Sequence, residues 1–431
     1  MLMRMMKSCF KNFLLSLLLI LTNNIIINMY TNALNSLPMT TQITQLKQLQ
    51  LPKLRSFIPI PHSTSISTTN LKIHGNLRVL QFNILADGLF GLRDDLGAFS
   101  RTQKEDVSWS RRKIQLLHEI TQYNPDIITL QECDHYYDTF LPELAAKGYD
   151  GLFAPKPASA CLEVSDNFDG CAIFINRNKL RIVSSETITF ALSKADLAIN
   201  GKAEITNVDD TKIKAQNQVG LIAVCRLLAG GPPIVVATTH LKAAKNAMGE
   251  NYRYVEIMQL LTGIEKLINN LSMHDKTSTP AILLTGDLNA SPTDGTGYTP
   301  LAYSAVKAHP LDLRSVMNDD YEPLVLQKNE DIKEKVWTTW KARRKHGVES
   351  VTKHCIDYIL YNRPIDKSSN SNSRPGFRPI SALELFKTEE IGENLLPSSV
   401  YPSDHVAIAA DLQLVSYEKP PGIDLLENII R

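Results

Sequence analysis

The stretch AILLTGDLN, residues Ala281–Asn289, decides the fold, because a short apolar segment runs directly into polar side chains. Residues Ala281–Thr285 have the length and apolar character of a buried β-strand. The acid Asp287 and the amide Asn289 follow at once, where such a strand would end. Loops at strand ends are where layered α/β folds build their functional sites. The stretch therefore predicts a buried strand that delivers a carboxylate and an amide to a site.

The same pattern recurs at other places along the chain. Any one of these polar residues has an ordinary structural explanation, such as a helix cap, a turn former or a half-buried histidine. Their joint occurrence in one order is not explained in that way. The polar residues are Asn83 at the end of Gln81–Asn83, Glu132 after Ile127–Leu130, His240 after Ile234–Thr239, Asp357 within Cys355–Leu360, and Asp404 with His405 before Val406–Ala409.

This set of side chains indicates a metal-assisted reaction at phosphorus. Carboxylate and amide oxygens are the hard ligands that suit Mg²⁺, which keeps several waters and meets phosphate oxygens. Imidazoles and a carboxylate base suit the attack of water on a phosphoester. The sequence therefore predicts Mg²⁺ as the cofactor.

From Leu77 onward, short apolar strands alternate with helical stretches, which is typical of a layered α/β domain. Helices are expected over Trp109–Tyr123 and through Tyr254–Ile268, where apolar residues recur on one helical face. The sequence contains no internal repeat and, in particular, no leucine-rich repeats. Further strands are expected at Leu77–Leu85, Gly170–Ile175 and Val219–Leu228.

The 431 residues are 43% apolar and 21% charged, which is typical of a globular protein. The net charge of +1 hides an asymmetry, because residues 1–86 contain eight basic and no acidic residues. The remainder carries 38 basic and 45 acidic residues, a net charge of −7, which does not favour binding of long polyanions. Six cysteines without a C-x-x-C pair argue against a disulfide scaffold or a structural zinc site and favour a reducing compartment.

We expect residues 1–75 to form a targeting leader and disordered linker, residues 76–416 the folded domain, and residues 417–431 a C-terminal tail. The apolar run Phe13–Leu21 is shorter than the roughly 20 residues of a spanning helix, so no stable membrane association of the mature domain is expected. The basic, acid-free composition favours a mitochondrial leader, with a cytoplasmic location as the alternative and secretion less favoured. The mature protein is expected to be a monomer.

The ordered motifs resemble those of the endonuclease/exonuclease/phosphatase superfamily over about residues 76–415, and within it the nocturnin family. The superfamily also includes the carbon-catabolite-repressor-type deadenylases. The resemblance implies an α/β fold, a four-layer sandwich of two packed mixed β-sheets flanked by helices, with the site in the cleft at one edge. The stretches that carry it are LQECDHYYDTF (Leu130–Phe140), APKPASACLEVSDNFDGCAIF (Ala154–Phe174), NQVG (Asn217–Gly220), THLKA (Thr239–Ala243), TTWK (Thr338–Lys341) and YPSDH (Tyr401–His405).

The resemblance also implies a role for each polar residue. Glu132 would be the principal Mg²⁺ ligand, with Asn83 nearby. Asp287 would orient or deprotonate the attacking water, and Asn289 would hold the phosphate. The remaining roles would be transition-state stabilisation by His405 paired with Asp357, support of the site by Asp404, and donation to a phosphate oxygen by His240.

For the substrate, the resemblance implies removal of the 2′-phosphate from NADP⁺ and NADPH. Lys156 and Lys242 match positions that look like dinucleotide-phosphate contacts in that family, and Asn217 of the NQVG stretch joins them as a substrate-binding candidate. The sequence departs from the family at Ala244, which stands in place of an arginine and cannot grip a phosphate bidentately. The candidates for a replacement charge are Lys245 and Arg253, each of which is also explained as an ordinary solvated charge.

Two other functions remain open from the sequence. A poly(A)-specific 3′-exoribonuclease, with RNA as substrate, would need a basic track leading out of the cleft and aromatic side chains that stack on bases. The net acidic main body and the lack of leucine-rich repeats to dock a deadenylase complex favour the dinucleotide instead. The third function is a catalytically silent RNA- or protein-binding adaptor, against which the intact set of catalytic residue types argues.

Overall fold

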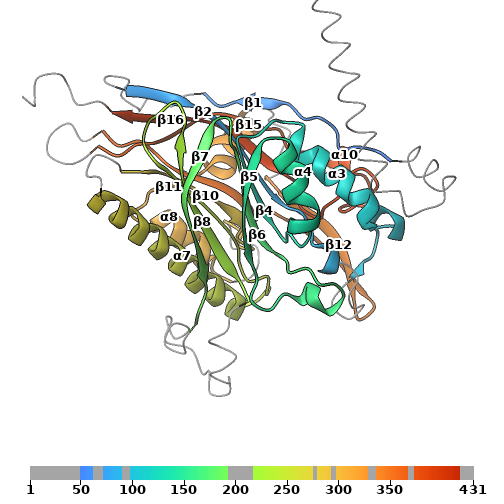
Figure 1. Ribbon diagram of the computed structural model, residues 1–431. Helices are drawn as coiled ribbons and strands as arrows, with labels where there is room; N and C mark the ends of the chain where they lie inside the picture. Colours follow the sequence, from blue (N-terminus) through green and yellow to red (C-terminus); the bar gives the residue numbers. More distant parts are fainter. Residues whose placement is uncertain are drawn as a thin grey trace, which may run out of the picture.

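The computed structural model describes residues 49–61, 71–89, 98–192, 217–274, 279–292, 298–328, 336–366 and 373–417. Within these residues two β-sheets pack face to face, and helices cover the outer face of each sheet (Figure 1). The expected four-layer α/β sandwich is confirmed by this arrangement.

The first sheet has the strand order β1-β15-β16-β2-β4-β6-β5. Only β2 and β4 run parallel among these neighbours, and the other pairs are antiparallel. The strands are β1 (Phe57–Pro59), β2 (Leu71–Asn83), β4 (Ile127–Gln131), β5 (Tyr149–Pro155), β6 (Gly170–Asn176), β15 (Gly376–Leu383) and β16 (Ile408–Tyr417).

The second sheet has the strand order β11-β14-β10-β9-β8-β7, with β9 and β10 parallel. A small third sheet joins β13, β12 and β3 beside the packed pair. The strands of these two sheets are β7 (Leu180–Thr189), β8 (Val219–Leu227), β9 (Ile234–His240), β10 (Ala281–Asp287), β11 (Leu313–Ser315), β14 (Asp357–Asn362), β3 (Ala98–Phe99), β12 (Thr339–Lys345) and β13 (Val348–His354).

Helices cover the two outer faces (Figure 1). α3 (Trp109–Thr121) and α4 (Leu141–Ala146) pack on the first sheet, and α7 (Ala247–His274) and α8 (Leu301–Ala308) pack on the second. The shorter elements are α9 (Glu322–Lys328), α10 (Thr388–Ile391) and single helical turns at Asp87–Leu89, Lys104–Val107, Tyr136–Phe140, Ala160–Glu163 and Val316–Tyr321.

The strands are apolar on both faces because each sheet is buried on both faces. In β2, Val79 lies in the core between the sheets, whereas its neighbour Leu80 packs under the helices of the first sheet. In β10, Leu283 lies between the sheets and Leu284 packs under α7 and α8. This explains why the strands read as continuous apolar runs rather than as an alternating pattern.

The expected strands and helices are confirmed in the centre of the fold. The stretch Ala281–Thr285 lies in β10, and the helix expected over Trp109–Tyr123 is α3. α7 contains the helix expected through Tyr254–Ile268 and is longer at both ends. The strands not foreseen are mostly short or lie at sheet edges, where fewer residues are apolar: β1, β3, β5, β7, β11, β12, β13 and β15.

The placement of residues 49–61 corrects the boundary expected at residue 75. This segment adds β1 to the edge of the first sheet, where Phe57–Pro59 pair with β15, and buries the side chain of Arg55. β2 already begins at Leu71. Composition does not separate this segment from the leader, because it is basic and acid-free like the residues before it and its pairing partners lie far away in sequence. The leader itself and the tail fall on residues 1–48 and 418–431, which are outside the described residues.

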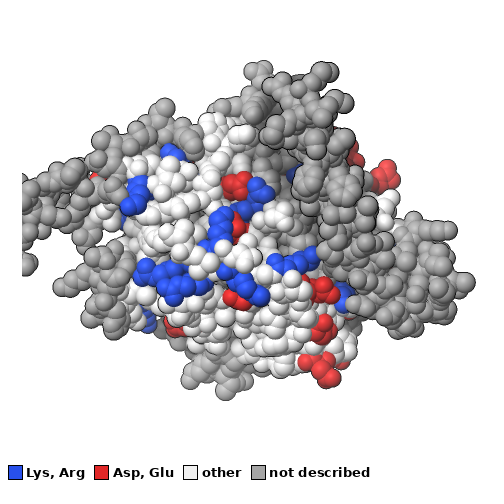
Figure 2. Space-filling model, turned by 45° about the horizontal axis from the view of Figure 1, so that its top comes forward, with Lys and Arg blue, Asp and Glu red and all other residues white. Residues whose placement is uncertain are grey.

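In the part of the chain that the structure describes, we find no helix with both the length and the apolar character needed to cross a membrane. On the face drawn in Figure 2, basic side chains gather in several short groups, and some of them lie next to acidic ones. Ion pairs such as Arg78–Asp411 (2.7 Å) and Lys179–Asp126 (2.7 Å) place opposite charges side by side on the first sheet.

Candidate active site

Strand pairing brings the predicted polar residues together at one end of the two sheets. In the second sheet, Asp287 is the register partner of His240 on β9 and of Asp357 on β14. In the first sheet, Asn83 at the end of β2 pairs with Gln131, the residue before Glu132. Residues that are far apart in sequence therefore meet because apolar strands of matched length carry them to the same edge.

The glycine of the TGD motif is required for this pairing. Gly286 has a φ of 146°, in a region that favours glycine, and a Cβ there would lie 2.2 Å from the carbonyl oxygen of Thr239. The close approach of β10 to β9 thus depends on the missing side chain. It sets the carboxylate of Asp287 beside the imidazole of His240.

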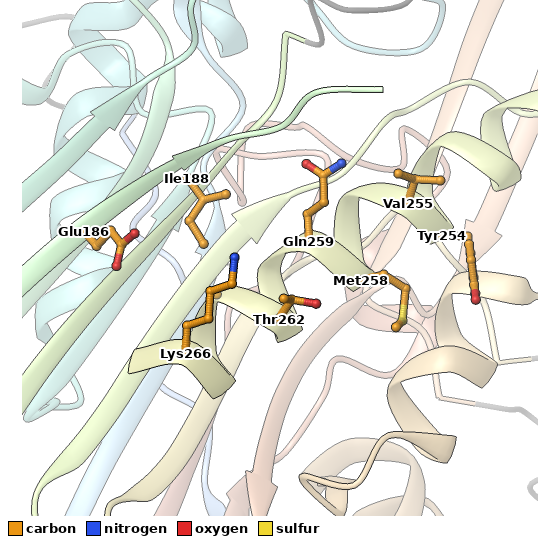
Figure 3. Close-up of a pocket in the computed structure, with 9 residues that line it drawn as sticks. Glu186, Ile188, Tyr254, Val255, Met258, Gln259, Thr262 and Lys266 are labelled. Carbon is orange, nitrogen blue, oxygen red and sulfur yellow. The ribbon is translucent and has the colours of Figure 1, made fainter. Parts of the chain in front are cut away.

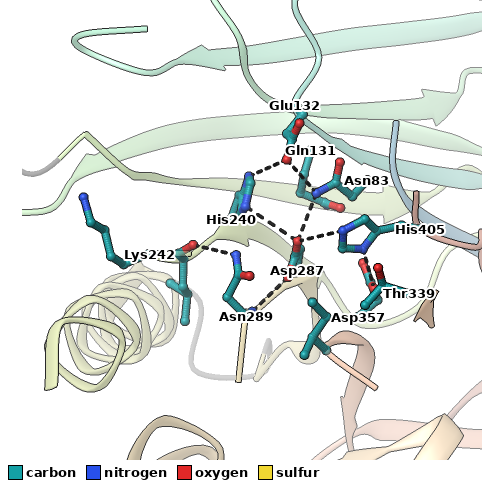
Figure 4. A network of polar contacts seen from close by, with 12 residues as sticks. Asn83, Gln131, Glu132, His240, Lys242, Asp287, Asn289, Thr339, Asp357 and His405 are labelled. Carbon is teal, nitrogen blue, oxygen red and sulfur yellow. Dashed lines mark hydrogen bonds and ion pairs between the residues drawn. The ribbon is translucent and has the colours of Figure 1, made fainter. Parts of the chain in front are cut away.

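Asp287 is the centre of the site (Figure 4). Its Oδ2 accepts a hydrogen bond from Asn83 Nδ2 (2.9 Å) and lies 3.6 Å from His240 Nε2 and 3.7 Å from His405 Nε2. Its Oδ1 accepts from the backbone N–H of Asn289 (2.8 Å). Burial raises the pKa of Asp287 above its usual range; the charge of His405 opposes this rise and that of Asp357 adds to it.

His405 and Asp357 form a hydrogen-bonded pair behind Asp287. His405 Nδ1 lies 2.8 Å from Asp357 Oδ2, which also accepts from the hydroxyl of Thr338 (2.6 Å). Asp357 Oδ1 accepts from Gln81 Nε2 (3.2 Å). Burial alone would lower the pKa of His405, but the charge of Asp357 raises it to about 9. His405 is therefore an imidazolium at neutral pH.

His240 is held in the opposite protonation state. Its pKa is lowered well below 6.5, first by burial and then by the positive charges of Lys156, His405 and Lys341. Its Nδ1 is buried and finds no hydrogen-bond partner among the described residues, although Glu132 Oε1 lies 3.9 Å away. A neutral imidazole thus faces Asp287 from one side while the imidazolium of His405 faces it from the other.

Glu132 and Asn83 are the residues that suit a metal ion. Glu132 Oε1 accepts from Asn83 Nδ2 (3.1 Å) and Oε2 accepts from the backbone N–H of Ala86 (3.1 Å). Glu132 has a φ of 55°, a strained conformation for a residue with a side chain and one that is typical of functional sites. The carboxylate of Glu132 is the hard oxygen ligand that fits Mg²⁺, while Asn83 turns its Nδ2 toward this carboxylate and its Oδ1 accepts from the backbone N–H of Leu85 (3.1 Å).

Asp287, Asp357 and His405 also offer three ligand atoms within 4.8 Å of one another. Both oxygens of Asp357 already accept hydrogen bonds, and His405 Nδ1 is engaged by Asp357. This trio is therefore better explained as a hydrogen-bonded relay than as a metal site.

Asp404 faces cations that the sequence did not place in the site. Its carboxylate contacts the Lys341 ammonium and lies 3.4 Å from Arg343 Nη2, both on β12. Burial would raise the pKa of Asp404, but these two cations and His405 hold it well below its usual range. The sequence signal for this group was the TTWK stretch, which ends at Lys341 and also supplies the hydroxyl of Thr338 that contacts Asp357.

The substrate-binding candidates Lys156 and Asn217 are engaged by other parts of the protein, whereas Lys242 and Lys245 are more exposed. Lys156 is buried and pairs with Asp169 (2.6 Å), and the side chain of Asn217 binds both backbone groups of Ala158 in the adjoining loop. Lys242 extends away from the polar network in Figure 4. Lys245 is exposed as a residue, but its amine lies against the protein, 3.4 Å from the hydroxyl of Thr352; this partial burial, followed by the charges of Lys341 and Arg343, lowers its pKa to about 8.

Arg253 is a correction, because its guanidinium has no donor left for a phosphate. Nε and Nη2 contact Glu250 at 2.8 and 2.7 Å, and Nη1 donates to the carbonyls of Lys242 and Ala244 at 2.7 Å each. Nη2 also donates to the Tyr298 hydroxyl (3.2 Å). Arg253 therefore supports the loop that follows β9 from behind. Sequence alone cannot distinguish a supporting arginine from a substrate-binding one at this spacing.

A separate pocket of about 460 Å³ lies between β7 and α7 (Figure 3). Its lining combines Ile188 and Met258 with the charged Glu186 and Lys266. None of the residues named as catalytic or metal-binding contributes to its lining, so this pocket is not part of the site around Asp287.

Comparisons with known proteins agree with this geometry. The endonuclease/exonuclease/phosphatase family model matches residues 80–405. The chain is 33% identical over 341 residues to nocturnin from Mus musculus, covering 78% of this chain and 66% of the mouse protein. It therefore spans slightly less than two thirds of that relative's length.

Two solved structures share the fold. The human nocturnin catalytic domain with bound sulfate anion is 28% identical with a TM-score of 0.54, covering 84% of this chain and 97% of the human domain. ANGEL2, described as a 2′,3′-cyclic phosphatase, is 18% identical with a TM-score of 0.57, covering 81% of this chain and 99% of ANGEL2. With the family model matching most of the chain and the nocturnin relatives covering 78% of it, the chain belongs to the endonuclease/exonuclease/phosphatase family.

Proposed function

We propose that the protein is a Mg²⁺-dependent phosphoester hydrolase that removes the 2′-phosphate from NADP⁺ and NADPH. The observation that carries this proposal is the surroundings of Asp287 Oδ2. Asn83 Nδ2, His240 Nε2 and His405 Nε2 meet that oxygen within 3.7 Å, and Glu132 lies across His240 from it. A carboxylate among positioned donors, beside a metal-binding carboxylate, suits the attack of water on a phosphoester.

In this reaction Asp287 orients the attacking water and accepts its proton. The new bond forms between the water oxygen and phosphorus, the bond from phosphorus to the 2′-oxygen breaks as that oxygen takes up a proton from the solvent, and the products are inorganic phosphate and NAD⁺ or NADH. His405 and His240 lie on either side of Asp287, and their Nε2 atoms are the donors available to the phosphoryl oxygens. Asn289, held by its contacts with Asp287 and Leu241, completes this ring of donors.

Glu132 would hold the metal ion, with Asn83 beside it. Mg²⁺ bound there would supply a Lewis acid for the charge that grows on the phosphoryl oxygens. The residues themselves contribute a fixed geometry, because Asn83 bridges the carboxylates of Glu132 and Asp287 (3.1 and 2.9 Å). The bridge keeps the metal-binding and water-binding carboxylates in register with each other.

The dinucleotide is proposed as substrate for two reasons. Relatives at about 33% identity include nocturnins, and a member of that family has been solved with a sulfate, an anion of the same shape as phosphate. Next to the site, burial of the Lys245 amine and then the nearby charges of Lys341 and Arg343 lower its pKa, which places three cations close together. An exposed cation beside two others is suited to bind a phosphate group.

The test compares two substrates in one assay. Pure protein is incubated with Mg²⁺ and either NADPH or oligo(A), and released phosphate and chain shortening are both measured. Asp287→Asn is the matched control, since it keeps the shape of the side chain and removes the base. The proposal is supported if the wild type releases phosphate from NADPH and Asp287→Asn does not. Shortening of oligo(A) without that release would assign the site to RNA, and no reaction with either substrate would overturn the enzymatic assignment.

A further inference from the structure

The strongest unassigned feature is a buried cluster that joins the segment before the first long strand to the loop that carries His405. Arg55 lies in residues 49–61, and its side chain is only 3% exposed. Glu119 of α3, its ion-pair partner at 2.6 Å, is fully buried. Neither residue belongs to the site around Asp287, yet a buried ion pair of this kind is rarely retained without a structural or functional reason.

The ion pair contacts the catalytic loop at both ends. The hydroxyl of Tyr401 donates to Glu119 Oε1 (2.9 Å) and accepts from the backbone N–H of Ala407 (2.9 Å). Arg55 Nη2 donates to the carbonyl oxygen of Ala407 (2.9 Å). Asp404 and His405 lie between Tyr401 and Ala407 in the sequence. The loop of residues 401–407 is therefore held at both ends by the Arg55–Glu119 pair.

A second set of contacts joins the same two segments through the same helix. The side-chain amide of Gln115, one turn before Glu119 on α3, donates to the carbonyl of Gln50 (2.7 Å) and to the carbonyl of Ser399 (2.9 Å). The middle of the loop is fixed within the site itself, where the hydroxyl of Ser403 donates to the carbonyl of Asn83 (2.7 Å). The loop is thus set between the metal-binding strand and the segment that contains Arg55.

We propose that Arg55 is a positioning residue for catalysis, which holds His405 in place by fixing the loop of residues 401–407 through Glu119 and the carbonyl of Ala407. The inference rests on the proposed function, because it concerns the rate of that reaction. A displacement of about 1 Å in a catalytic group typically costs on the order of a hundredfold in rate. His405 is two residues from the carbonyl that Arg55 holds, so loss of the contact should reach it.

Four variants of the full chain test this role. Arg55→Met removes the contacts with Glu119, the carbonyl of Ala407 and the carbonyl of Glu384 (3.2 Å), and Arg55→Lys keeps the charge but loses the fork. The double variant Arg55→Met/Glu119→Gln removes both buried charges, while the new side-chain amide on α3 can still accept from the hydroxyl of Tyr401. Lys53→Met is the matched control, because Lys53 lies on the same segment but is 68% exposed and pairs with Glu390 near the surface. For each variant kcat and KM for NADPH are measured at a temperature where it is fully folded, together with the denaturation midpoint.

We expect Arg55→Met to lower kcat by roughly ten- to a hundredfold while KM changes little. The double variant should regain much of the midpoint, since no buried charge is left unpaired, but not the kcat, since the contact with Ala407 is still missing. The kcat of Arg55→Lys should lie between those of Arg55→Met and the wild type. Lys53→Met should match the wild type in both kcat and denaturation midpoint. Recovery of kcat along with the midpoint in the double variant, or wild-type kcat in folded Arg55→Met, would show that Arg55 only stabilises the fold. A wild type that releases no phosphate would instead refute the proposed function and leave no reaction for Arg55 to support.

Discussion

Two histidines face the same carboxylate oxygen of Asp287 and hold opposite charges. His405 has a carboxylate behind it, at 2.8 Å, and its pKa is raised to about 9. His240 has cations around it, and its pKa is lowered well below 6.5. Environment rather than residue type therefore places a cation on one side of Asp287 and a neutral imidazole on the other.

The pKa of His405 predicts a pH dependence. Turnover of NADPH should fall as the pH rises through about 9, where the imidazolium loses its proton. Asp357→Asn should move this limb to lower pH and cut kcat strongly, by roughly a thousandfold or more, because an amide neither favours the charged form nor orients the ring. The measurements are the pH profile of kcat and the NMR titration of His405.

The free energy of unfolding should also decrease as the pH rises, because His405 loses its proton. A histidine whose folded pKa lies above its unfolded value of about 6.5 contributes stability that is fully present below pH 6.5 and is lost as the pH rises to about 9. Asp411→Asn is the control, because Asp411 pairs with Arg78 on the first sheet and should leave the pH profile of kcat unchanged. An Asp357→Asn enzyme with the wild-type pH profile would contradict the assignment.

Glu132 is expected to bind the metal by itself to a large extent. Glu132→Gln keeps the size of the side chain but removes the charge that attracts Mg²⁺, and its one amide oxygen can accept from only one of Asn83 and Ala86. Mg²⁺ binding, followed by calorimetry, should weaken by at least about tenfold, and turnover should fall with it. Glu105→Gln, at an exposed position outside the site, is the control. Unchanged Mg²⁺ affinity in Glu132→Gln would place the metal elsewhere.

At the scale of elements, α7 determines the shape of the loop that follows β9. Glu256 accepts from the backbone N–H of Lys242 (2.9 Å), and Arg253 donates to the carbonyls of Lys242 and Ala244. Asn246 caps the helix by accepting from the N–H of Gly249 (2.7 Å). The loop that carries the candidate phosphate contacts is therefore bound through its backbone to the N-terminal turns of α7.

A substitution in α7 separates support of this loop from direct substrate binding. Arg253→Lys should lower the free energy of unfolding by roughly 1–3 kcal/mol, because a lysine cannot replace the contacts with Glu250 and two carbonyls. The measurement is urea denaturation alongside the KM for NADPH, with Arg177→Lys, at a half-exposed ion pair, as the control. A raised KM with unchanged stability would mean that Arg253 binds phosphate after all.

The candidate site around Asp287 could be predicted from sequence because a polar residue directly after an apolar run marks the end of a strand. Asp287 and His240 each follow a run of buried residues, and parallel pairing of β9 and β10 puts them side by side. The support around the centre carries no such local signal. Arg55 and Glu119 are 64 positions apart, and the strand β12, which brings Lys341 to Asp404, is too rich in charges to be recognised as a strand. The partners in such ion pairs are determined by the tertiary structure, and their separation in the sequence gives no signal of the contact.

At the scale of the whole molecule, the two sheets divide the site between them. The first sheet supplies Asn83 and Glu132, and the second supplies His240, Asp287 and Asp357. His405 enters from the loop that precedes β16. The site therefore exists only while the sheets stay packed, and whatever locks the first sheet to the loop of residues 401–407 also determines the geometry of the site.

The segment of residues 49–61 is such a lock, and its removal should be costly. Chains that begin at residue 49 and at residue 62 differ only in this segment, which contributes β1, the buried Arg55 and a cation–π contact between Arg55 and Phe386 (4.7 Å). Without it Glu119 is left buried and unpaired, a loss of roughly 3–5 kcal/mol in the free energy of unfolding. Urea denaturation and NADPH hydrolysis of both chains measure the effect. If the shorter chain matches the longer one in both measurements, residues 49–61 do not belong to the working domain, and the boundary near residue 75 is restored.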